Sequence, residues 1–415
     1  MIQPLRRLGC LALAASAIAA AQNFSLKDGD TVVFYGDSIT DQRLYTTFAE
    51  TYVLTRFPAL RLKFVHSGWS GDRVDGGGGG PIDLRLRRDV IAHRPAVITI
   101  MLGMNDGSYR TYDEAIFRKY ASGYEKIIRD LKTALPDLRI TVIEPSPHDD
   151  VTRAPNVEGG YNSVLVRYGQ FVKDLAKREH LNDADLNAPV VAVLQKAHTQ
   201  NATLSEQIVP DRVHPDPAGH LIMAEALLKS WHAPAVVSDV AIDAQALKTV
   251  HSENAEVSSI DNSRGLRWSE REHALPMPID WKDEVTALAV HSSDFLDALD
   301  QEKLRVSGLA AGNYTLKIDG ETVGDFSADR FAQGVNLAEY PTPMAKQAAE
   351  VHKLTIEHND IHFARWRTVE VPLDSQGFSL TSAESSLDAL ENQVMLAQWV
   401  AAQPRIHQYE LTRVP

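Results

Sequence analysis

The sequence has almost no cysteine, because Cys10 is the single one in 415 residues. A chain with one cysteine forms no internal disulfide and no zinc site built on several thiolates. The sequence also lacks an H-E-x-x-H motif, so no motif indicates a metalloprotease-like hydrolase. We therefore expect no metal ion and no other cofactor.

Long apolar runs are equally scarce, and the main one lies near the N-terminus at residues 8–20. It is too short to cross a bilayer, which takes about 20 residues. Arg6 and Arg7 precede it, and Ala19-Ala20-Ala21 follows as an A-x-A cleavage site. The pattern is typical of a secretory signal peptide, which we place at residues 1–21. We expect a secreted or periplasmic protein whose mature chain has no thiol.

Net positive charge is absent too, since 42 Lys and Arg residues face 55 Asp and Glu residues, for a net charge of −13. An acidic surface disfavours nucleic acid and anionic membranes as partners. A neutral or apolar substrate, either a small molecule or a polysaccharide, is easier to reconcile with this charge.

Residues 31–231 alternate strand-like and helix-like patterns. The predicted strands are Thr31–Tyr35, Leu62–Val65, Ala96–Leu102, Arg139–Glu144 and, more weakly, Asp183–Leu186. The predicted helices are Thr46–Arg56, Asp83–His93, Glu114–Leu135, Tyr161–Arg178, Pro189–His198 and Asp216–Trp231. Such alternation indicates parallel strands joined by crossover helices. We predict a three-layer α/β domain over residues 22–235.

The pattern changes after this domain. Residues 236–341 have short apolar runs and turn signals, including a hairpin whose two-residue turn is Asp319-Gly320. Residues 342–415 contain two helical patterns, at 342–369 and 383–402. We predict a β-rich module at 236–341, packed on the α/β domain, and a helical C-terminal segment at 342–415 that braces it.

The first motif with chemical potential is Gly36-Asp37-Ser38-Ile39-Thr40, directly after the first strand. Open α/β sheets place their sites at the carboxyl ends of strands, so Ser38 is a candidate nucleophile. Taken alone, the string also fits a turn with an Asp or Ser helix cap. It does not fit the G-x-S-x-G elbow of α/β-hydrolases, because Thr40 stands where the last glycine belongs.

The second motif is Asp211-Arg212-Val213-His214-Pro215, before the last helix of the domain. A serine hydroxyl needs an adjacent base, and histidine suits this role because its pKa lies near neutral pH. A carboxylate must then hold the imidazole in the right tautomer. Asp211 and His214 are candidates for these roles, although a helix cap beside a surface histidine gives the same string.

Two further segments offer hydrogen-bond donors for an oxyanion. Gly71 lies in Ser67-Gly68-Trp69-Ser70-Gly71-Asp72, and Asn105 lies in Gly103-Met104-Asn105-Asp106 after the third strand. Each also has an ordinary explanation, as a turn glycine and as a helix cap.

In this order the four segments resemble the blocks of the SGNH hydrolases, also called the GDSL esterase/lipase family. The resemblance covers about residues 29–232. It implies a flavodoxin-like sandwich with about five parallel strands. It also implies that Ser38 is the nucleophile, His214 the general base and Asp211 its partner. The oxyanion hole would be formed by the amides of Ser38 and Gly71 and by the Asn105 side chain. The family often has asparagine a few residues before the glycine of the second block, and here His66 stands near that place.

Weaker features concern the substrate pocket. Asp37, Trp69 and Tyr109 flank the site segments and are candidates for its walls, with ordinary packing as the alternative. The glycine run 76–80 indicates either a mobile rim or close approach of another group. His148-Asp149-Asp150 has metal-binding residue types, but we expect a solvated loop there.

We predict a secreted serine esterase that acts through an acyl-Ser38 intermediate and removes acetyl groups from carbohydrate. The alternatives are a lipase, lysophospholipase or broad-range esterase, and an exported glycan-binding protein without catalysis.

Overall fold

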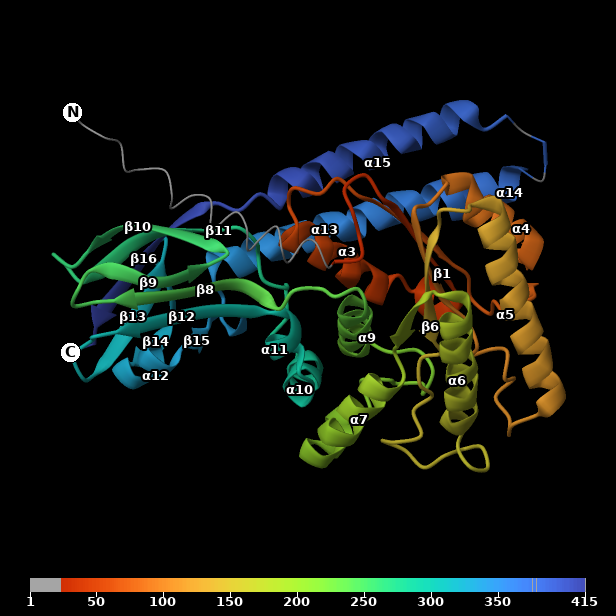
Figure 1. Ribbon diagram of the computed structural model, residues 1–415, viewed down its shortest axis with the longest axis horizontal. Coiled ribbons are helices and arrows are strands. Elements are labelled where there is room, and N and C mark those ends of the chain that lie inside the picture. The colour runs from red at the N-terminus through yellow and green to blue at the C-terminus, as the bar shows by residue number, and fades with distance from the viewer. Residues whose placement is uncertain (1–23, 375, 378, 415) are drawn as a thin grey trace.

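The computed structural model describes residues 24–374, 376–377 and 379–414. The predicted signal peptide lies outside the described residues. An α/β domain occupies one end of the molecule and two further β-sheets occupy the other (Figure 1). The long helices α13, Pro343–Phe363, and α15, Thr381–Ala401, lie along the α/β domain.

The α/β domain is built on five parallel strands in the order β2-β1-β5-β6-β7. Their bounds are β1 Thr31–Gly36, β2 Lys63–Gly68, β5 Val97–Met101, β6 Arg139–Glu144 and β7 Asn182–Asp185. This strand order is that of flavodoxin-like folds. β2 is added on one side of β1, and the later strands, starting with β5, are added on its other side. Ligands bind in such folds outside the carboxyl ends of the strands flanking this change of side. The predicted fold class is confirmed.

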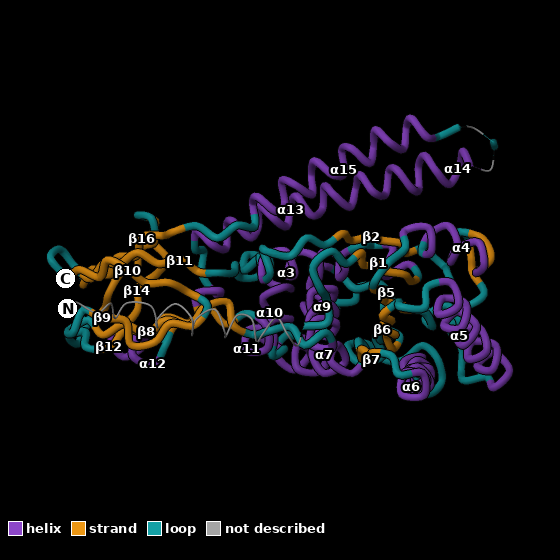
Figure 2. The backbone as a smooth tube through the Cα atoms, turned by 45° about the horizontal axis from the view of Figure 1, so that its top comes forward, coloured by secondary structure: helices purple, strands orange, loops and turns teal. Residues whose placement is uncertain are grey.

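The central strands are apolar on both faces because helices cover both. All five residues of β5 are buried, as are the last five of β1. The helices α3 and α9 pack against each other on one side, and α4, α5 and α6 line the other (Figure 2). The helix bounds are α2 Ser38–Asp41, α3 Leu44–Arg56, α4 Ile82–Asp89, α5 Glu114–Ala134, α6 Tyr161–Glu179, α7 Ala188–Gln200, α8 Ala202–Ser205 and α9 Pro217–Ser230.

The second half of the chain forms two facing sheets with a separate apolar core, which includes Trp268, Leu304 and Leu316. One sheet has the order β10-β11-β16-β13-β14 and the other β15-β12-β8-β9. The bounds are β8 Val236–Asp243, β9 Lys248–Glu253, β10 Ala255–Asp261, β11 Leu266–Glu272, β12 Gln301–Ser307, β13 Asn313–Ile318, β14 Glu321–Ser327, β15 Val335–Asn336 and β16 Ile406–Arg413.

The predicted Asp-Gly hairpin is present between β13 and β14. Asp319 and Gly320 both have positive φ, at 52° and 82°. Two consecutive residues of this kind form the tight turn that matches strand twist. Ile318 accordingly pairs with Glu321.

The C-terminal segment is helical as predicted, but the chain ends on a strand that the prediction missed. α13 Pro343–Phe363 continues through a π-helical stretch Ala364–Glu370 into α14 Val371–Asp374, and α15 Thr381–Ala401 returns antiparallel to α13. β16 then inserts between β11 and β13. Buried His407, Tyr409 and Leu411 alternate in it with more exposed residues, as in a strand with one covered face.

Three short helices interrupt the predicted β-rich region. Their bounds are α10 Glu284–Ser292, α11 Phe295–Leu299 and α12 Ala328–Gln333. α10 and α11 pack on α7 and α9, and their Phe295 and Leu299 belong to the core of the α/β domain. The β-rich region is thus joined to that domain by shared apolar packing. None of the helices in the described part of the chain is both long and apolar enough to cross a bilayer.

Candidate active site

The four sequence motifs meet at the carboxyl edge of the parallel sheet. Ser38 follows β1, Gly71 follows β2 and Asn105 follows β5, while residues 211–214 form the loop before α9. Hydrogen bonds link segments that are far apart in the sequence, as between Ser38 and His214 or Asn105 and Asp72.

Ser38, His214 and Asp211 form one hydrogen-bonded line. Nε2 of His214 lies 2.8 Å from Oγ of Ser38, and Nδ1 lies 2.7 Å from Oδ2 of Asp211. The side chains of His214 and Asp211 are 36% and 56% exposed, so the line lies open to solvent. This arrangement can transfer a proton from the serine hydroxyl to the imidazole while the carboxylate holds the ring.

Asp211 is fixed by its own loop. Its Oδ1 accepts hydrogen bonds from the amides of Val213 at 2.9 Å and His214 at 2.7 Å. Partial burial would raise the pKa of Asp211, but these amides and the His214 ring lower it below its ordinary value. The carboxylate is therefore charged at neutral pH, as the orienting role requires.

Arg212, in the middle of this loop, has a left-handed backbone conformation with φ of 75°. A non-glycine residue keeps such a conformation only where its surroundings hold it. The Asp149 amide donates to the Arg212 carbonyl at 2.8 Å, and Nη1 of Arg212 donates to the Asp149 carbonyl at 3.0 Å.

The prediction of a solvated loop at 148–150 is therefore wrong, because His148 and Asp149 are buried. This segment braces the loop that carries His214. Within the described residues, no group of three or more His, Cys, Asp or Glu side chains has an arrangement that could hold a metal ion.

Ser38 is the first residue of α2, and Asp37 caps this helix. The Asp37 carboxylate accepts from the Ile39 amide at 3.1 Å and is buried, which raises the pKa of Asp37 to about 7. The buried Asp37 side chain thus faces the start of α2, and its place beside the substrate pocket stays a prediction. The cap fixes the turn on which Ser38 sits.

Asn105, which follows β5, is held by hydrogen bonds to Asp72 and Tyr109. Nδ2 of Asn105 donates to the Asp72 carbonyl at 3.1 Å, and the Tyr109 hydroxyl donates to Oδ1 of Asn105 at 3.1 Å. A side-chain amide has two N–H donors, so one remains for a substrate oxygen. The Tyr109 side chain is 42% exposed and thus lies at the rim of the site.

Trp69 packs against the C-terminal segment rather than standing free as a pocket wall. The Arg367 guanidinium lies 3.5 Å from its ring centroid, and the Trp366 ring meets it edge-on at 5.6 Å. The glycine run also comes close to this ring. A Cβ at Gly79 would lie 2.6 Å from Trp69 atoms, so close approach explains the glycine there.

A polar cavity of about 450 Å³ opens beside Gly71. Arg73, Asp75 and the glycine-rich ribbon formed by β3 Gly76–Gly77 and β4 Gly80–Pro81 line the rest of it. Charged and backbone groups therefore dominate the surface next to the candidate oxyanion donor.

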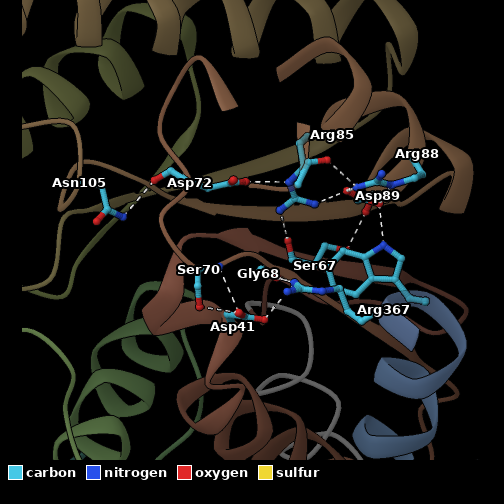
Figure 3. Close-up of polar contacts among 12 residues, drawn as sticks. Asp41, Ser67, Gly68, Ser70, Asp72, Arg85, Arg88, Asp89, Asn105 and Arg367 are labelled. Carbon is cyan, nitrogen blue, oxygen red and sulfur yellow. Dashed lines mark hydrogen bonds and ion pairs between the residues drawn. The ribbon is translucent and has the colours of Figure 1, made fainter. Parts of the chain in front are cut away.

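Sequence reasoning missed a buried charged network behind this loop (Figure 3). Arg85 donates to Oδ2 of Asp72 at 2.7 Å and to the Ser67 carbonyl at 2.8 Å, and it also pairs with Asp89. No motif marks Arg85, and its apolar neighbours on α4 gave no reason to single it out.

His66, where the family often has asparagine, is buried in a second polar network. Its Nδ1 contacts Thr46 Oγ1 at 2.7 Å and its Nε2 contacts Glu50 Oε2 at 3.0 Å. This histidine links β2 to α3 and does not contact Ser38, His214 or Asp211.

Comparison with known proteins identifies the domain that carries this site. The GDSL-like lipase/acylhydrolase family model matches residues 34–222. Residues 34–222 belong to this family. An acetylxylan esterase of Geobacillus stearothermophilus is 28% identical over 223 residues, which are 48% of this chain and 93% of that protein. These two matches indicate that the domain of residues 34–222 is a carboxylic ester hydrolase of the GDSL type.

Two solved structures show how far the likeness extends. A gut microbial diltiazem-metabolizing enzyme has 23% identity and a TM-score of 0.83, and the match covers 94% of this chain and 100% of that one. At that identity the likeness shows the fold alone, and it includes the second half of the chain. A catalytic mutant of an acetylxylan esterase from Geobacillus stearothermophilus has 24% identity and a TM-score of 0.41, covering 50% of this chain and 96% of that one.

Proposed function

We propose that this GDSL-family hydrolase is an exported esterase that removes acetyl groups from carbohydrate through an acyl-Ser38 intermediate. The observation that carries the proposal is the line from Ser38 Oγ through the His214 ring to the Asp211 carboxylate, with contacts of 2.8 Å and 2.7 Å.

In the first step, Ser38 Oγ attacks the ester carbonyl carbon while Nε2 of His214 accepts the hydroxyl proton. The carbonyl oxygen becomes an oxyanion, which receives hydrogen bonds from the amides of Ser38 and Gly71 and from Nδ2 of Asn105. Collapse of this intermediate breaks the bond to the alcohol oxygen, to which the protonated His214 returns its proton.

In the second step, water attacks the acyl-Ser38 carbonyl and gives its proton to His214. Collapse releases the carboxylic acid and restores the serine hydroxyl. Asp211 stays ionised throughout and stabilises the imidazolium that forms twice in the cycle.

Three features favour a short acyl group on a polar alcohol. The catalytic line is open to solvent, which admits a bulky alcohol such as a glycan. The cavity beside Gly71 is lined by Arg73, Asp75 and glycines rather than by an apolar wall. Among the described residues, the large exposed apolar side chains other than Tyr109 lie outside the site segments. A lipase acting on long acyl chains needs an apolar surface near its nucleophile. The curated relative from Geobacillus stearothermophilus is named as an acetylxylan esterase, which supports the same substrate class.

Export is supported by the basic, apolar and small-residue pattern of residues 6–21. Expression of the full chain in a bacterial host should yield a mature protein that begins at Gln22. N-terminal sequencing tests this, and recovery of the intact N-terminus from the cytoplasm would contradict it.

A fluorophosphonate probe tests the nucleophile. It should label the wild-type protein at Ser38 and leave Ser38→Ala unlabelled. Wild-type protein that neither reacts with the probe nor turns over p-nitrophenyl acetate would overturn the proposed function.

A chain-length series of p-nitrophenyl esters beside acetylated xylan tests the substrate class. We expect the highest kcat/KM for acetate and release of acetic acid from the glycan. A preference for acyl chains of eight or more carbons would support the lipase alternative.

A further inference from the structure

The backbone around Gly71 is not held by packing of Gly71 itself. This residue has φ of 81°, and a Cβ placed on it would meet no atom within 4 Å. The direction of its N–H therefore depends on the two flanking residues, Ser70 and Asp72. Each flank is tied to a network that reaches the C-terminal segment (Figure 3).

The Ser70 flank is held through Asp41. Oδ2 of Asp41 accepts the Ser70 amide at 3.1 Å and the Ser70 hydroxyl at 2.7 Å. Asp41 lies in α2, the same short helix that begins with Ser38. Its other oxygen, Oδ1, lies 3.3 Å from Nη1 of Arg367, which also donates to the Gly68 carbonyl at 3.3 Å.

The Arg367 guanidinium also stacks on the indole of Trp69, the residue before Ser70. It lies 3.5 Å from the ring centroid, and only 18% of the Arg367 side chain is exposed. The Arg367 guanidinium thus contacts the Gly68 carbonyl and the Trp69 ring directly. It is linked to Ser70 through Asp41.

The Asp72 flank is held through Arg85 and Asp89. Nε of Arg85 donates to Oδ2 of Asp72 at 2.7 Å, and Asp89 pairs with Arg85. The indole N–H of Trp366 donates to Oδ1 of Asp89 at 2.7 Å, and the Trp366 side chain is buried. The Asp72 carbonyl in turn accepts Nδ2 of Asn105, the second candidate oxyanion donor.

We propose that Arg367 is a positioning residue for the oxyanion loop 68–72, so that the C-terminal segment completes the active site. The proposal rests on the proposed function, in which the Gly71 amide stabilises the oxyanion. Trp366 supports the other flank through Asp89 and Arg85. Neither side chain contacts the reacting atoms, and each acts by fixing the direction of the Gly71 amide.

Arginine suits this position because its planar guanidinium can stack and donate at the same time. A lysine keeps the charge toward Asp41 but loses the flat contact with Trp69 and the fork of donors. Arg367→Lys should therefore recover only part of what Arg367→Ala loses.

The test compares Arg367→Ala, Arg367→Lys and Arg365→Ala in the full-length protein with p-nitrophenyl acetate. Arg365 is the matched control, because its side chain is also 18% exposed but pairs with Glu370 and Asp388 inside the C-terminal segment. Since a misplaced group in an active site can cost about 100-fold, we expect kcat of Arg367→Ala to fall about 10- to 100-fold. We expect KM to change by less than about twofold, because the lost interaction belongs to the transition state.

Two further readouts separate positioning from a general structural effect. The pH profile of kcat/KM should keep its wild-type shape, because His214 and Asp211 are untouched. Tm of Arg367→Ala should match that of Arg365→Ala, although kcat differs. A kcat of Arg367→Ala within about twofold of wild type, or an equal loss in Arg365→Ala, would overturn the proposal.

Trp366→Phe tests the second flank independently. It removes the donor to Asp89 and keeps a ring beside Trp69, and we expect a fall in kcat of about 3- to 10-fold at unchanged KM. Full wild-type kcat in this variant would refute the contribution of Trp366.

Ser38→Ala, measured in parallel, separates a failure of the proposed function from a failure of the positioning role of Arg367. Activity that persists in Ser38→Ala means that the proposed function fails. An inactive Ser38→Ala beside a fully active Arg367→Ala means that only the role of the C-terminal segment fails.

Discussion

The catalytic line and the contact between α3 and the C-terminal helices are both built from histidines and carboxylates, but in opposite surroundings. His214 and Asp211 are 36% and 56% exposed. His358 lies between Glu50 and Glu391, and each of these three side chains is no more than 2% exposed. In the proposed mechanism the exposed group binds substrate and exchanges protons, whereas the buried group of His358, Glu50 and Glu391 forms a fixed charged contact between α3 and the C-terminal helices. Residue type alone therefore does not separate a catalytic histidine from a structural one.

The sharpest test of this contrast is His214→Ala. It removes the base that accepts the Ser38 proton, and kcat should fall on the order of 10⁶-fold, as in other serine hydrolase triads. The measurement is kcat with p-nitrophenyl acetate. His251→Ala is the matched control, because His251 lies exposed on β9, and it should keep full activity.

Asp211→Asn should have the next largest effect. The change keeps the shape of the side chain but removes the charge that orients the imidazole, so kcat should fall by about 10⁴-fold. The lowered pKa of Asp211 adds a pH prediction, because the wild type keeps this carboxylate ionised well into the acidic range. Protonation of Asp211 should therefore not limit wild-type activity at mildly acidic pH. An Asp211→Asn variant within tenfold of wild-type kcat would contradict the assigned role.

Asn105→Ala should lower kcat by about 100- to 1,000-fold, since one oxyanion donor is lost. Tyr109→Phe is the graded comparison, because it removes only the hydroxyl that donates to Oδ1 of Asn105. Its loss should be clearly smaller. Equal losses in the two variants would indicate that the tyrosine itself contacts substrate.

The buried group of His358, Glu50 and Glu391 should make the stability of the protein depend on pH, with no change in its activity. Burial disfavours charge on His358, but Glu50 and Glu391 outweigh it and raise the pKa of His358 from 6.5 to about 9. A group whose pKa is raised on folding stabilises the folded state fully below its unfolded pKa. This stabilisation is lost as the pH rises through the folded value.

His358→Gln should therefore lower the free energy of unfolding at pH 6 by about 3 kcal/mol, because it breaks a buried charged network. The difference from wild type should shrink between pH 7 and pH 9.5. Glu50 also contacts His66, and His362 lies near Glu391, but burial lowers the pKa of both histidines, so both stay neutral in the folded protein and His358 alone carries this transition. Thermal unfolding over this pH range measures the effect, and a difference that grows with pH would contradict it.

The predicted site residues agree most closely with the structure where they directly follow a predicted strand. Ser38, Gly71 and Asn105 each follow an apolar strand, and parallel strands bring their carboxyl ends to one edge. Asp211 and His214 are three residues apart, so one loop carries both. These relations are local, and a single sequence contains them.

The contacts of Trp366 and Arg367 could not be found in the same way. The hydrogen bond from Trp366 to Asp89 joins residues 277 positions apart, and no strand or turn signal links the two. Trp69 flanks an oxyanion segment in the sequence, but Arg367, which stacks on its ring, lies near the other end of the chain. β16 was missed because polar and apolar residues do not alternate strictly in it: Ile406 is exposed, whereas His407 is buried.

The central claim is that ester hydrolysis passes through an acyl group on Ser38. Rapid quenching of the wild-type protein with p-nitrophenyl acetate, followed by peptide mass mapping, tests it most directly. The account predicts that the peptide containing Ser38 gains the mass of one acetyl group during turnover and that Ser38→Ala shows no such gain. Turnover by the wild type with acetyl found on another residue, or catalysis that persists in Ser38→Ala, would contradict it.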